Sequence, residues 1–371
     1  MLVHKVPVEI RPDDTGRVKI DDECGLACVF CHNEGTPVTA DNSDAEPGQY
    51  TGTPGRTGRV SIYLATNGAR FLAARIEPGP EFALALAGLR GSIRTREIHF
   101  TGGEPTLHPR LPALVRQVHD MGFTVGLTSN GENGASVLEE CAAAGLDRVN
   151  LSVFGTNAAE LASVQAPRFS SAALAEKKLA ALARTIETGL RSGIKVSANL
   201  VVGDGTQIPR ALRIIEQYGR DVTVRFLLNL ETEEQSREAI LETLATLDAV
   251  PVRHIITAGT SDERTRYRLP DGRTVYAKNI RPVRLPDTCA GCRFNNPRDC
   301  QEGFYGVRMY RAKGGPYMIG VCIRRMDICV PVGEFVMSQR AREVQAFRDA
   351  ETTRLTALHA HPATAPAPAG P

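Results

Sequence analysis

The chain lacks the features that mark several protein classes. It has no run of about 18 apolar residues, so no membrane-spanning helix is expected. Its first residues, MLVHKVPVEIRPDD, carry acids and a proline where a secretory signal would need an apolar segment. The net charge is +2, and no basic run has interleaved aromatic residues, so neither nucleic acid nor a membrane surface is an expected partner. These absences predict a cytoplasmic protein.

A phosphate-binding P-loop is also missing. The stretch TGTPGRTGR (residues 51–59) has glycines and a threonine, but it lacks the G-K-[ST] ending of that loop. It belongs to residues 36–60, which are rich in Gly, Pro, Thr and Asp. This composition predicts a flexible insertion with no core of its own.

Cysteine, in contrast, is abundant. The chain has nine cysteines, an odd number that excludes complete pairing, and a reducing compartment disfavours a disulfide framework. Three lie within residues 24–31 and five within residues 289–329. The remaining one, Cys141, lies in a helical pattern and is interpreted as a small buried residue. The two groups favour two metal or iron–sulfur sites.

Predicted strands and helices alternate from about residue 16 to about residue 235. The strands include REIHFTGGEP, FTVGLTSNG, RVNLSVFG, KVSANLVVG and VTVRFLLNL. This rhythm indicates five or six parallel βα units and an α/β fold of the open or partial barrel type. In such folds the chemistry lies at the carboxyl ends of the strands.

The rest of the chain divides by composition. Residues 1–235 are expected to form the barrel region, and residues 236–331 a connector followed by a cysteine-rich domain. Residues 332–358 look like a charged C-terminal helix. Residues 359–371, HAHPATAPAPAGP, have the composition of a disordered tail.

The first cysteine group, Cys24, Cys28 and Cys31, has the spacing C-x-x-x-C-x-x-C. A structural zinc site needs four ligands, and His32 would have to fold back beside Cys31 to supply the fourth. An iron–sulfur cubane held by three thiolates instead leaves one iron open, and that iron can bind a substrate or cofactor.

This motif, with Phe30 before its last cysteine, resembles the signature of the radical S-adenosylmethionine (SAM) superfamily. The sequence TGGEP (101–105), which ends a predicted strand, is similar to that family's GGE motif. The resemblance covers roughly residues 16–235 and implies a partial (β/α)6 barrel with a SAM-binding [4Fe-4S] cluster. It also implies that SAM is cleaved to methionine and a 5′-deoxyadenosyl radical, with an electron from an external donor such as flavodoxin or ferredoxin.

The same resemblance implies contacts to SAM. Gly102 and Gly103 let the backbone approach the methionine end closely, because neither has a Cβ. Glu104 would accept from the ligand amine, or else be a solvated turn carboxylate. Three polar residues near later strand ends are expected to contact ribose or carboxylate, or else to be satisfied locally: Asn130, Ser152 and Asn199.

The second cysteine group resembles the C-terminal region of the GTP 3′,8-cyclase family and the Twitch domains that hold auxiliary clusters. It departs from the cyclase family, which has three cysteines there and a longer gap before the third. GTP is therefore not carried over as the substrate, and a fully ligated [4Fe-4S] cluster is favoured over zinc. The expected ligands are Cys289, Cys292, Cys300 and Cys322, with Cys329 as a spare or alternative.

Signals for the substrate are few, and no catalytic residue is assigned. Arg225 resembles an arginine on the last barrel strand of the cyclase family, and Arg308 and Arg324 flank the second cysteine group. Arginines near a cluster suit a phosphate or carboxylate substrate, although each could instead form a surface salt bridge.

The sequence therefore predicts an enzyme that cyclises or rearranges a small polar molecule, possibly nucleotide- or sugar-like, in cofactor or natural-product biosynthesis. The alternative enzyme is a dehydrogenase or a peptide-modifying enzyme whose auxiliary cluster accepts an electron. The alternative outside enzymes is an iron–sulfur electron carrier or a zinc-structured binding module. The GGE strand and the three-thiol motif speak against that last alternative.

Overall fold

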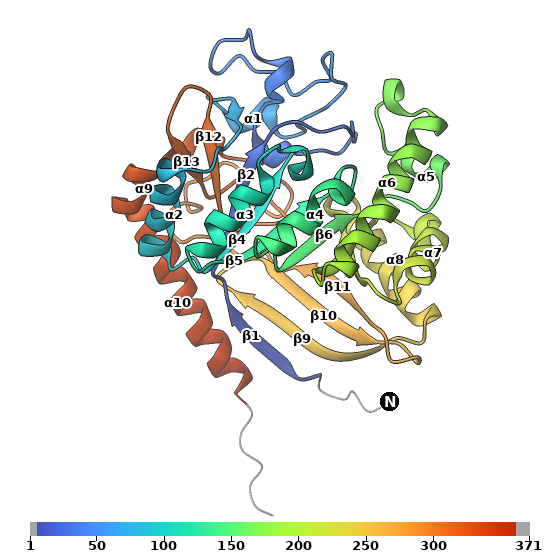
Figure 1. Ribbon diagram of the computed structural model, residues 1–371. Coiled ribbons are helices and arrows are strands. Elements are labelled where there is room, and N and C mark those ends of the chain that lie inside the picture. Colours follow the sequence, from blue (N-terminus) through green and yellow to red (C-terminus); the bar gives the residue numbers. More distant parts are fainter. Residues whose placement is uncertain (1–5, 361–371) are drawn as a thin grey trace, which may run out of the picture.

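The computed structural model describes residues 6–360. A curved sheet forms the centre of the fold (Figure 1). Its central strands are parallel and neighbour one another in the order β2 (Thr15–Asp21), β4 (Glu97–Gly102), β5 (Thr124–Ser129), β6 (Arg148–Ser152), β7 (Lys195–Val202) and β8 (Thr223–Leu228). Helices separate these strands along the chain. The arrangement confirms the predicted α/β fold, a partial (β/α)6 barrel.

The longer helices pack on the outer face of the strands (Figure 1). They are α2 (Pro80–Ile93), α3 (Leu111–Asp120), α4 (Gly134–Ala143), α6 (Ala172–Arg191), α7 (Ile208–Tyr218) and α8 (Glu233–Thr246). Apolar residues recur on one face of each helix; in α3 they are Leu111, Leu114, Val115 and Val118, all fully buried. None of the described helices is long and apolar enough to cross a lipid bilayer.

Shorter helices lie mainly in the loops. They are η1 (Asn33–Gly35), η2 (Thr39–Asp41), α1 (Leu64–Asn67), η3 (Pro105–Leu107), α5 (Ala158–Ser163), η4 (Pro167–Phe169), η5 (Gly205–Gln207), η6 (Leu230–Thr232) and η7 (Met326–Ile328).

Further strands extend the sheet at both edges. Beyond β8 lie β11 (Thr274–Ile280), β10 (Asp262–Arg268), β9 (Val250–Ala258) and β1 (Val8–Pro12). Beyond β2 lie β12 (Val307–Ala312), β13 (Tyr317–Gly320) and β14 (Val330–Pro331), and β3 (Ala73–Ala74) also pairs with β12. Because β12 is parallel to β2, the cysteine-rich region sits beside the strand that leads into the first cysteine group.

The C-terminal region forms two helices where the sequence predicted one over residues 332–358. They are α9 (Val332–Met337) and α10 (Gln339–His359), separated by Ser338. The Ser338 side chain accepts a hydrogen bond from the backbone N–H of Ala341 and so caps α10, which sequence periodicity alone did not reveal. Residues 361–371 of the predicted tail lie outside the described residues.

The strands alternate between an apolar outer face and a polar inner face. Outward residues such as Val18, Phe100 and Leu127 belong to the main hydrophobic core beneath the helices. The intervening residues line the barrel interior. In register across the strands they include the pairs Arg17–His99, Thr128–Asn150, Asn150–Ser197 and Asn199–Arg225. The fold therefore encloses a polar space rather than a second apolar core.

The segment 36–60, predicted as an insertion without a core, contains η2 and packs on the loop that follows β2. Asn42 donates to the carbonyl of Val38 at 3.0 Å and accepts from the N–H of Thr51 at 2.8 Å. Near its end, the buried Arg59 donates to Asn33 Oδ1 at 3.0 Å and to the carbonyl of Asp22. The composition of the segment gave no indication of this contact.

Candidate active site

The first cysteine group lies in the loop that follows β2, and its three thiols are partly buried. The Nδ2 of Asn130 donates to Cys24 Sγ at 3.5 Å, and the Nε2 of Gln165 donates to Cys28 Sγ at 3.4 Å. Amide donors toward sulfur are the kind of outer contact that supports a thiolate bound to iron. Gln165 was not singled out from the sequence, because it is far from the motif along the chain.

Burial keeps two of these thiols, Cys24 and Cys28, protonated when no metal is bound. It raises the pKa of Cys28 to about 12 and the pKa of Cys24 further still. Loading of a cluster must therefore release protons from both thiols. Within residues 6–360 no three Cys, His, Asp or Glu side chains converge on one metal-ion position. A cubane has a different requirement, because each protein thiolate binds a different iron of the cluster.

The glycine turn at the end of β4 packs directly on the start of the cysteine loop. Gly103 N donates to the carbonyl of Asp21 at 3.0 Å, and Glu104 N donates to the carbonyl of Glu23 at 2.6 Å. A Cβ on Gly103 would lie 2.3 Å from the Glu23 oxygen, and one on Gly102 would lie 2.5 Å from the Asp21 oxygen. Glycine is therefore required here by the protein's own backbone, besides any ligand.

Glu104 is fully buried, so it is not the solvated turn carboxylate considered as its alternative. Its Oε1 accepts from Thr106 N at 2.9 Å, Thr106 Oγ1 at 2.6 Å and Ser129 Oγ at 2.7 Å. Its Oε2 accepts from Asn130 N at 2.5 Å. A carboxylate offers about four acceptor positions, two on each oxygen, so Oε2 retains capacity for a ligand donor. Glu104 thus joins the ends of β4 and β5 and fixes Asn130.

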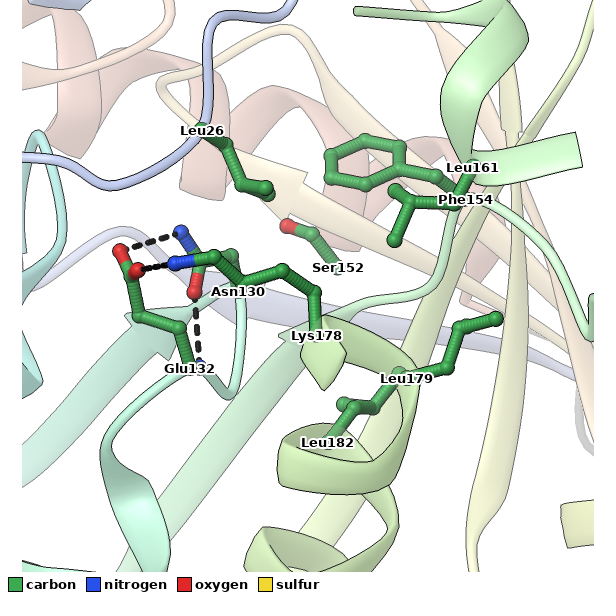
Figure 2. A pocket seen from close by; sticks show the side chains of 9 residues that line it. All are labelled: Leu26, Asn130, Glu132, Ser152, Phe154, Leu161, Lys178, Leu179 and Leu182. Carbon is green, nitrogen blue, oxygen red and sulfur yellow. Dashed lines mark hydrogen bonds and ion pairs between the residues drawn. The ribbon is translucent and has the colours of Figure 1, made fainter. Parts of the chain in front are cut away.

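Beside this turn lies a small cavity that is partly open to solvent, shown in Figure 2. It is lined by Leu26, Asn130, Glu132, Ser152, Phe154, Leu161, Lys178, Leu179 and Leu182. Asn130 and Ser152, two of the expected SAM contacts, thus share one cavity with Leu26 of the cysteine loop. One wall is polar and the other apolar, which suits a ligand with a charged end and an aromatic end.

The polar wall contains two residues that the sequence analysis missed, Glu132 and Lys178. Glu132 accepts from Gly25 N at 2.8 Å and from Asn130 Nδ2 at 3.2 Å, and it forms an ion pair with Lys178 (Figure 2). Glu132 follows directly after TSNG, so its position was a usable signal. On the apolar side, the ring of Phe30 lies 5.6 Å from that of Phe154.

Asn199 and Arg225 carry buried polar atoms that no group in the described part of the chain satisfies. These atoms are Asn199 Oδ1 and Arg225 Nε. Asn199 is in register with Ser152 on one side and with Arg225 on the other, so the three residues form a row across the sheet. Because an unpartnered buried polar atom is costly, such atoms mark where a ligand would supply the missing partner.

Cationic side chains gather in the barrel interior around Arg225. One acid, Asp262, lies among them and pairs with Lys278 at 3.3 Å and with Arg264 at 3.8 Å. Burial, and then the nearby Arg264, lower the pKa of Arg225 to about 10. The ring of Tyr305 has the guanidinium of Arg17 4.7 Å from its centroid and the ammonium of Lys278 4.1 Å from it. Burial and three surrounding arginines, at positions 17, 148 and 225, hold the pKa of His99 well below its usual range, so its ring is neutral.

Four cysteines of the second group line one cavity that is partly open to solvent: Cys289, Cys292, Cys300 and Cys322. Arg284, Phe294, Phe304 and Arg324 also line it. Cys329 is not among the lining residues; its Sγ lies 3.9 Å from Met326 Sδ. The fold thus brings together the four thiols that the sequence favoured and places the fifth elsewhere.

The family model of the radical SAM superfamily matches residues 18–217. This chain belongs to the radical SAM superfamily. It is therefore an enzyme of the class that uses a [4Fe-4S] cluster and SAM. The matched region contains the three-cysteine loop, the glycine turn and the cavity of Figure 2, all of which lie at the carboxyl ends of the barrel strands.

The chain is similar at low sequence identity to several known proteins. The chain is 28% identical to the GTP 3′,8-cyclase of Chlorobaculum tepidum over 295 residues, which are 76% of this chain and 74% of the relative. It is 23% identical to the probable GTP 3′,8-cyclase of Metallosphaera sedula over 304 residues, 81% and 82% of the two chains. Among solved structures it is similar to methylornithine synthase (TM-score 0.39, 14% identity, covering 67% of this chain and 64% of that one).

Replacing Glu104 by glutamine should uncouple the glycine turn from Asn130 in this radical SAM enzyme. The amide nitrogen of glutamine is a donor, and it would face one of the N–H or O–H groups that now donate to Glu104. We therefore expect a loss of about 1–3 kcal/mol in unfolding free energy. SAM binding, measured anaerobically by equilibrium dialysis, should weaken as Asn130 moves.

The matched control is Glu351→Gln. Glu351 is a buried carboxylate on α10 that accepts from Arg281 and Arg354, far from the turn along the chain. This variant should lose stability and keep SAM binding. Equal SAM affinity in both variants would show that Glu104 has no part in positioning the cofactor.

Proposed function

We propose that this radical SAM enzyme acts on a small anionic substrate, nucleotide- or sugar-like, held inside the barrel, and converts it by a radical cyclisation or rearrangement. The observation that carries the proposal is the cationic interior, in which the partly buried Arg225 has an Nε atom with no partner among the described residues. Such a cation is costly until an anion binds beside it. The distant relatives named GTP 3′,8-cyclase support a nucleotide as the substrate class.

In this proposal Cys24, Cys28 and Cys31 hold the first cluster, and the amides of Asn130 and Gln165 stabilise two of their sulfurs. When bound, the cluster and SAM supply a 5′-deoxyadenosyl radical that removes a hydrogen atom from the substrate. The chain's own contribution is to hold SAM and to exclude water. The residues proposed to line the SAM site are Phe30, Gly102, Gly103, Glu104, Asn130, Ser152 and Asn199.

Inside the barrel, Arg17, Arg225 and Lys278 are proposed to hold the anionic groups of the substrate. Arginine suits this role because its fork of N–H donors matches phosphate and carboxylate oxygens. Tyr305, between Arg17 and Lys278, offers an aromatic face for a base or sugar. The neutral ring of His99, hydrogen-bonded to Thr128 at 2.7 Å, adds a polar group without further charge.

The second cysteine cavity is proposed to hold a second [4Fe-4S] cluster. Four thiols on one cavity are enough to ligate every iron of a cubane, which leaves no open iron for substrate. This observation favours a second candidate function, in which the auxiliary cluster accepts an electron from the substrate radical. The product would then be oxidised, as in a dehydrogenase or a peptide-modifying enzyme.

One experiment separates these possibilities. The reconstituted protein is reduced anaerobically with dithionite or flavodoxin and incubated with SAM and panels of nucleotides, sugar phosphates and peptides. The proposal expects a nucleotide or sugar phosphate to increase 5′-deoxyadenosine formation and to give a product of unchanged mass. A product with fewer hydrogen atoms would favour the oxidative candidate. Stimulation by peptides alone would overturn the anionic substrate class.

The role of Cys322 can be tested against Cys329 by the same substitution at each position. Cys322→Ser should alter the electron paramagnetic resonance (EPR) spectrum of the auxiliary cluster or remove about four irons per chain, since a cubane holds four. Cys329→Ser should leave both the spectrum and the iron content unchanged. The reverse pattern would make Cys329 the fourth ligand and would require the region around η7 to rearrange.

A further inference from the structure

The residues that follow Cys31 are held by the C-terminal strand β12. The Nε of Arg308 donates to Glu34 Oε2 at 2.9 Å, and the hydroxyl of Tyr310 donates to the backbone carbonyl of Glu34 at 2.9 Å. All three residues are buried. Two side chains of β12 therefore hold both the carboxylate and the backbone of a residue three positions beyond a proposed cluster ligand.

A second contact joins the same loop to the residue after Cys322. The Nδ2 of Asn67, at the end of α1, donates to the carbonyl of Gly35 at 2.7 Å and to the carbonyl of Ile323 at 3.0 Å. Gly35 also packs on the backbone of Ile323, because a Cβ at this glycine would lie 2.8 Å from the Ile323 oxygen. The loops that carry Cys31 and Cys322 thus touch each other.

The backbone between these contacts is strained. Asn33 and Glu34 have φ angles of 47° and 53°, and Gly35 has a φ of 80°. Residues with a side chain seldom adopt such left-handed angles, and they persist only where the surroundings enforce them. The bonds from Arg308, Tyr310 and Asn67 hold Glu34 and Gly35 in this conformation. Asn33 is held separately, since its side chain donates to Asp22 Oδ1 at 2.9 Å and accepts from Lys19 Nζ at 2.9 Å.

Electrostatic interactions also keep Glu34 ionised within its ion pair with Arg308. Burial opposes ionisation of Glu34, but Arg308, His32 and Arg17 outweigh it and lower the pKa of Glu34 to about 2. Removing one member of a buried pair leaves an uncompensated charge, which disrupts the local structure more than removing both. The pair gives Arg308 a partner within the protein, whereas the sequence analysis expected it near a phosphate or carboxylate substrate; its guanidinium also lies 6.0 Å from the centre of the Tyr305 ring.

We propose that Glu34 and Arg308 are positioning residues that clamp the first cysteine loop to the C-terminal hairpin, so that the first cluster loads only when this hairpin is in place. The inference rests on the proposed function, since it takes Cys24, Cys28 and Cys31 as the cluster ligands. Tyr310 and Asn67 complete the clamp. None of the four is proposed to touch SAM or the substrate.

The test compares Arg308→Met with Arg348→Met. Arg348 lies on α10 and forms an equally buried ion pair with Asp13. Arg348 also donates to the carbonyl of Ile93. Both variants lose a buried pair, so both should be less stable. Per folded chain, Arg308→Met should lose about half of the iron, four of eight if both clusters are cubanes, and the EPR signal of the SAM-binding cluster. Arg348→Met should keep both.

A milder pair of variants covers the case in which Arg308→Met does not fold. Tyr310→Phe removes only the hydroxyl that donates to Glu34, whereas Tyr317→Phe makes the same change on β13, where the phenol lies against Arg311. The iron concentration that fills half of the first sites should be about fivefold higher in Tyr310→Phe than in the wild type. This is the effect expected from the loss of one hydrogen bond. Tyr317→Phe should match the wild type.

Two outcomes would contradict these ideas in distinguishable ways. If the wild type shows no iron signal that depends on Cys24, Cys28 and Cys31, the proposed function fails and the clamp fails with it. If the wild type has that signal, and Arg308→Met and Tyr310→Phe have the same signal per folded chain, the clamp alone is overturned.

Discussion

Simultaneous replacement of Cys24, Cys28 and Cys31 by alanine should reduce SAM cleavage to the level seen without protein. The three residues are the proposed ligands of the first cluster, and the other six cysteines of the described chain lie outside this loop. The measurement is 5′-deoxyadenosine formed by reduced, reconstituted protein. The iron content should fall by about four per chain, because one cubane is lost.

The control for this variant is Cys141→Ala. Cys141 is fully buried on α4 within the main hydrophobic core, as the sequence predicted. Its replacement should cost some stability and leave SAM cleavage intact. Wild-type cleavage by the triple variant would remove the assignment of the first cysteine group as the SAM-binding cluster site.

Replacing Arg225 by methionine should make the protein more stable and less able to bind its substrate. Methionine has nearly the length of arginine without the charge, so the variant removes a partly buried cation whose buried Nε has no partner among the described residues. We expect a gain of about 1–3 kcal/mol in unfolding free energy, the range for replacing buried charge by apolar side chains. Affinity for the anionic substrate should fall by about 10- to 100-fold, or about 1.4–2.8 kcal/mol.

Arg237→Met is the matched control for this prediction. Arg237 lies on α8 and forms an exposed ion pair with Glu233 at 2.6 Å, so its replacement should change stability by less than about 1 kcal/mol. A lower melting temperature for Arg225→Met would show that Arg225 serves the fold. Unchanged substrate affinity would place the anion elsewhere in the barrel.

The sequence predicted the barrel and the first cysteine site because both depend on local signals. Cys24, Cys28, Cys31 and the TGGEP turn are contiguous motifs, and the alternation of strands and helices repeats along the chain. The cationic interior was not predicted. Arg17, Lys278 and Arg264 lie on separate strands, so no local run of basic residues marks them. Their charge is also hidden in a nearly neutral total, to which the neighbouring Asp262 contributes.

Pairs that form across long stretches of chain were also beyond the sequence analysis. Glu34 and Arg308 are each unremarkable in their local sequence, and their contact exists only because β12 pairs with β2. Glu132 and Lys178 are a similar case, since a helix brings the lysine to the turn that carries the glutamate. Loop composition was likewise uninformative for residues 36–60, where Arg59 reaches Asn33.

The pairing of β12 with β2 has a consequence for how the protein is made. A ribosome releases β2 and the first cysteine loop early, but the strand that covers this edge of the sheet comes near the end of the chain. At about 5–20 residues per second, the wait is roughly 15–60 s. During that time the edge of β2 is open to pairing with another chain. Cells that overproduce the protein should therefore need a chaperone bound to the nascent chain until residues 307–312 emerge.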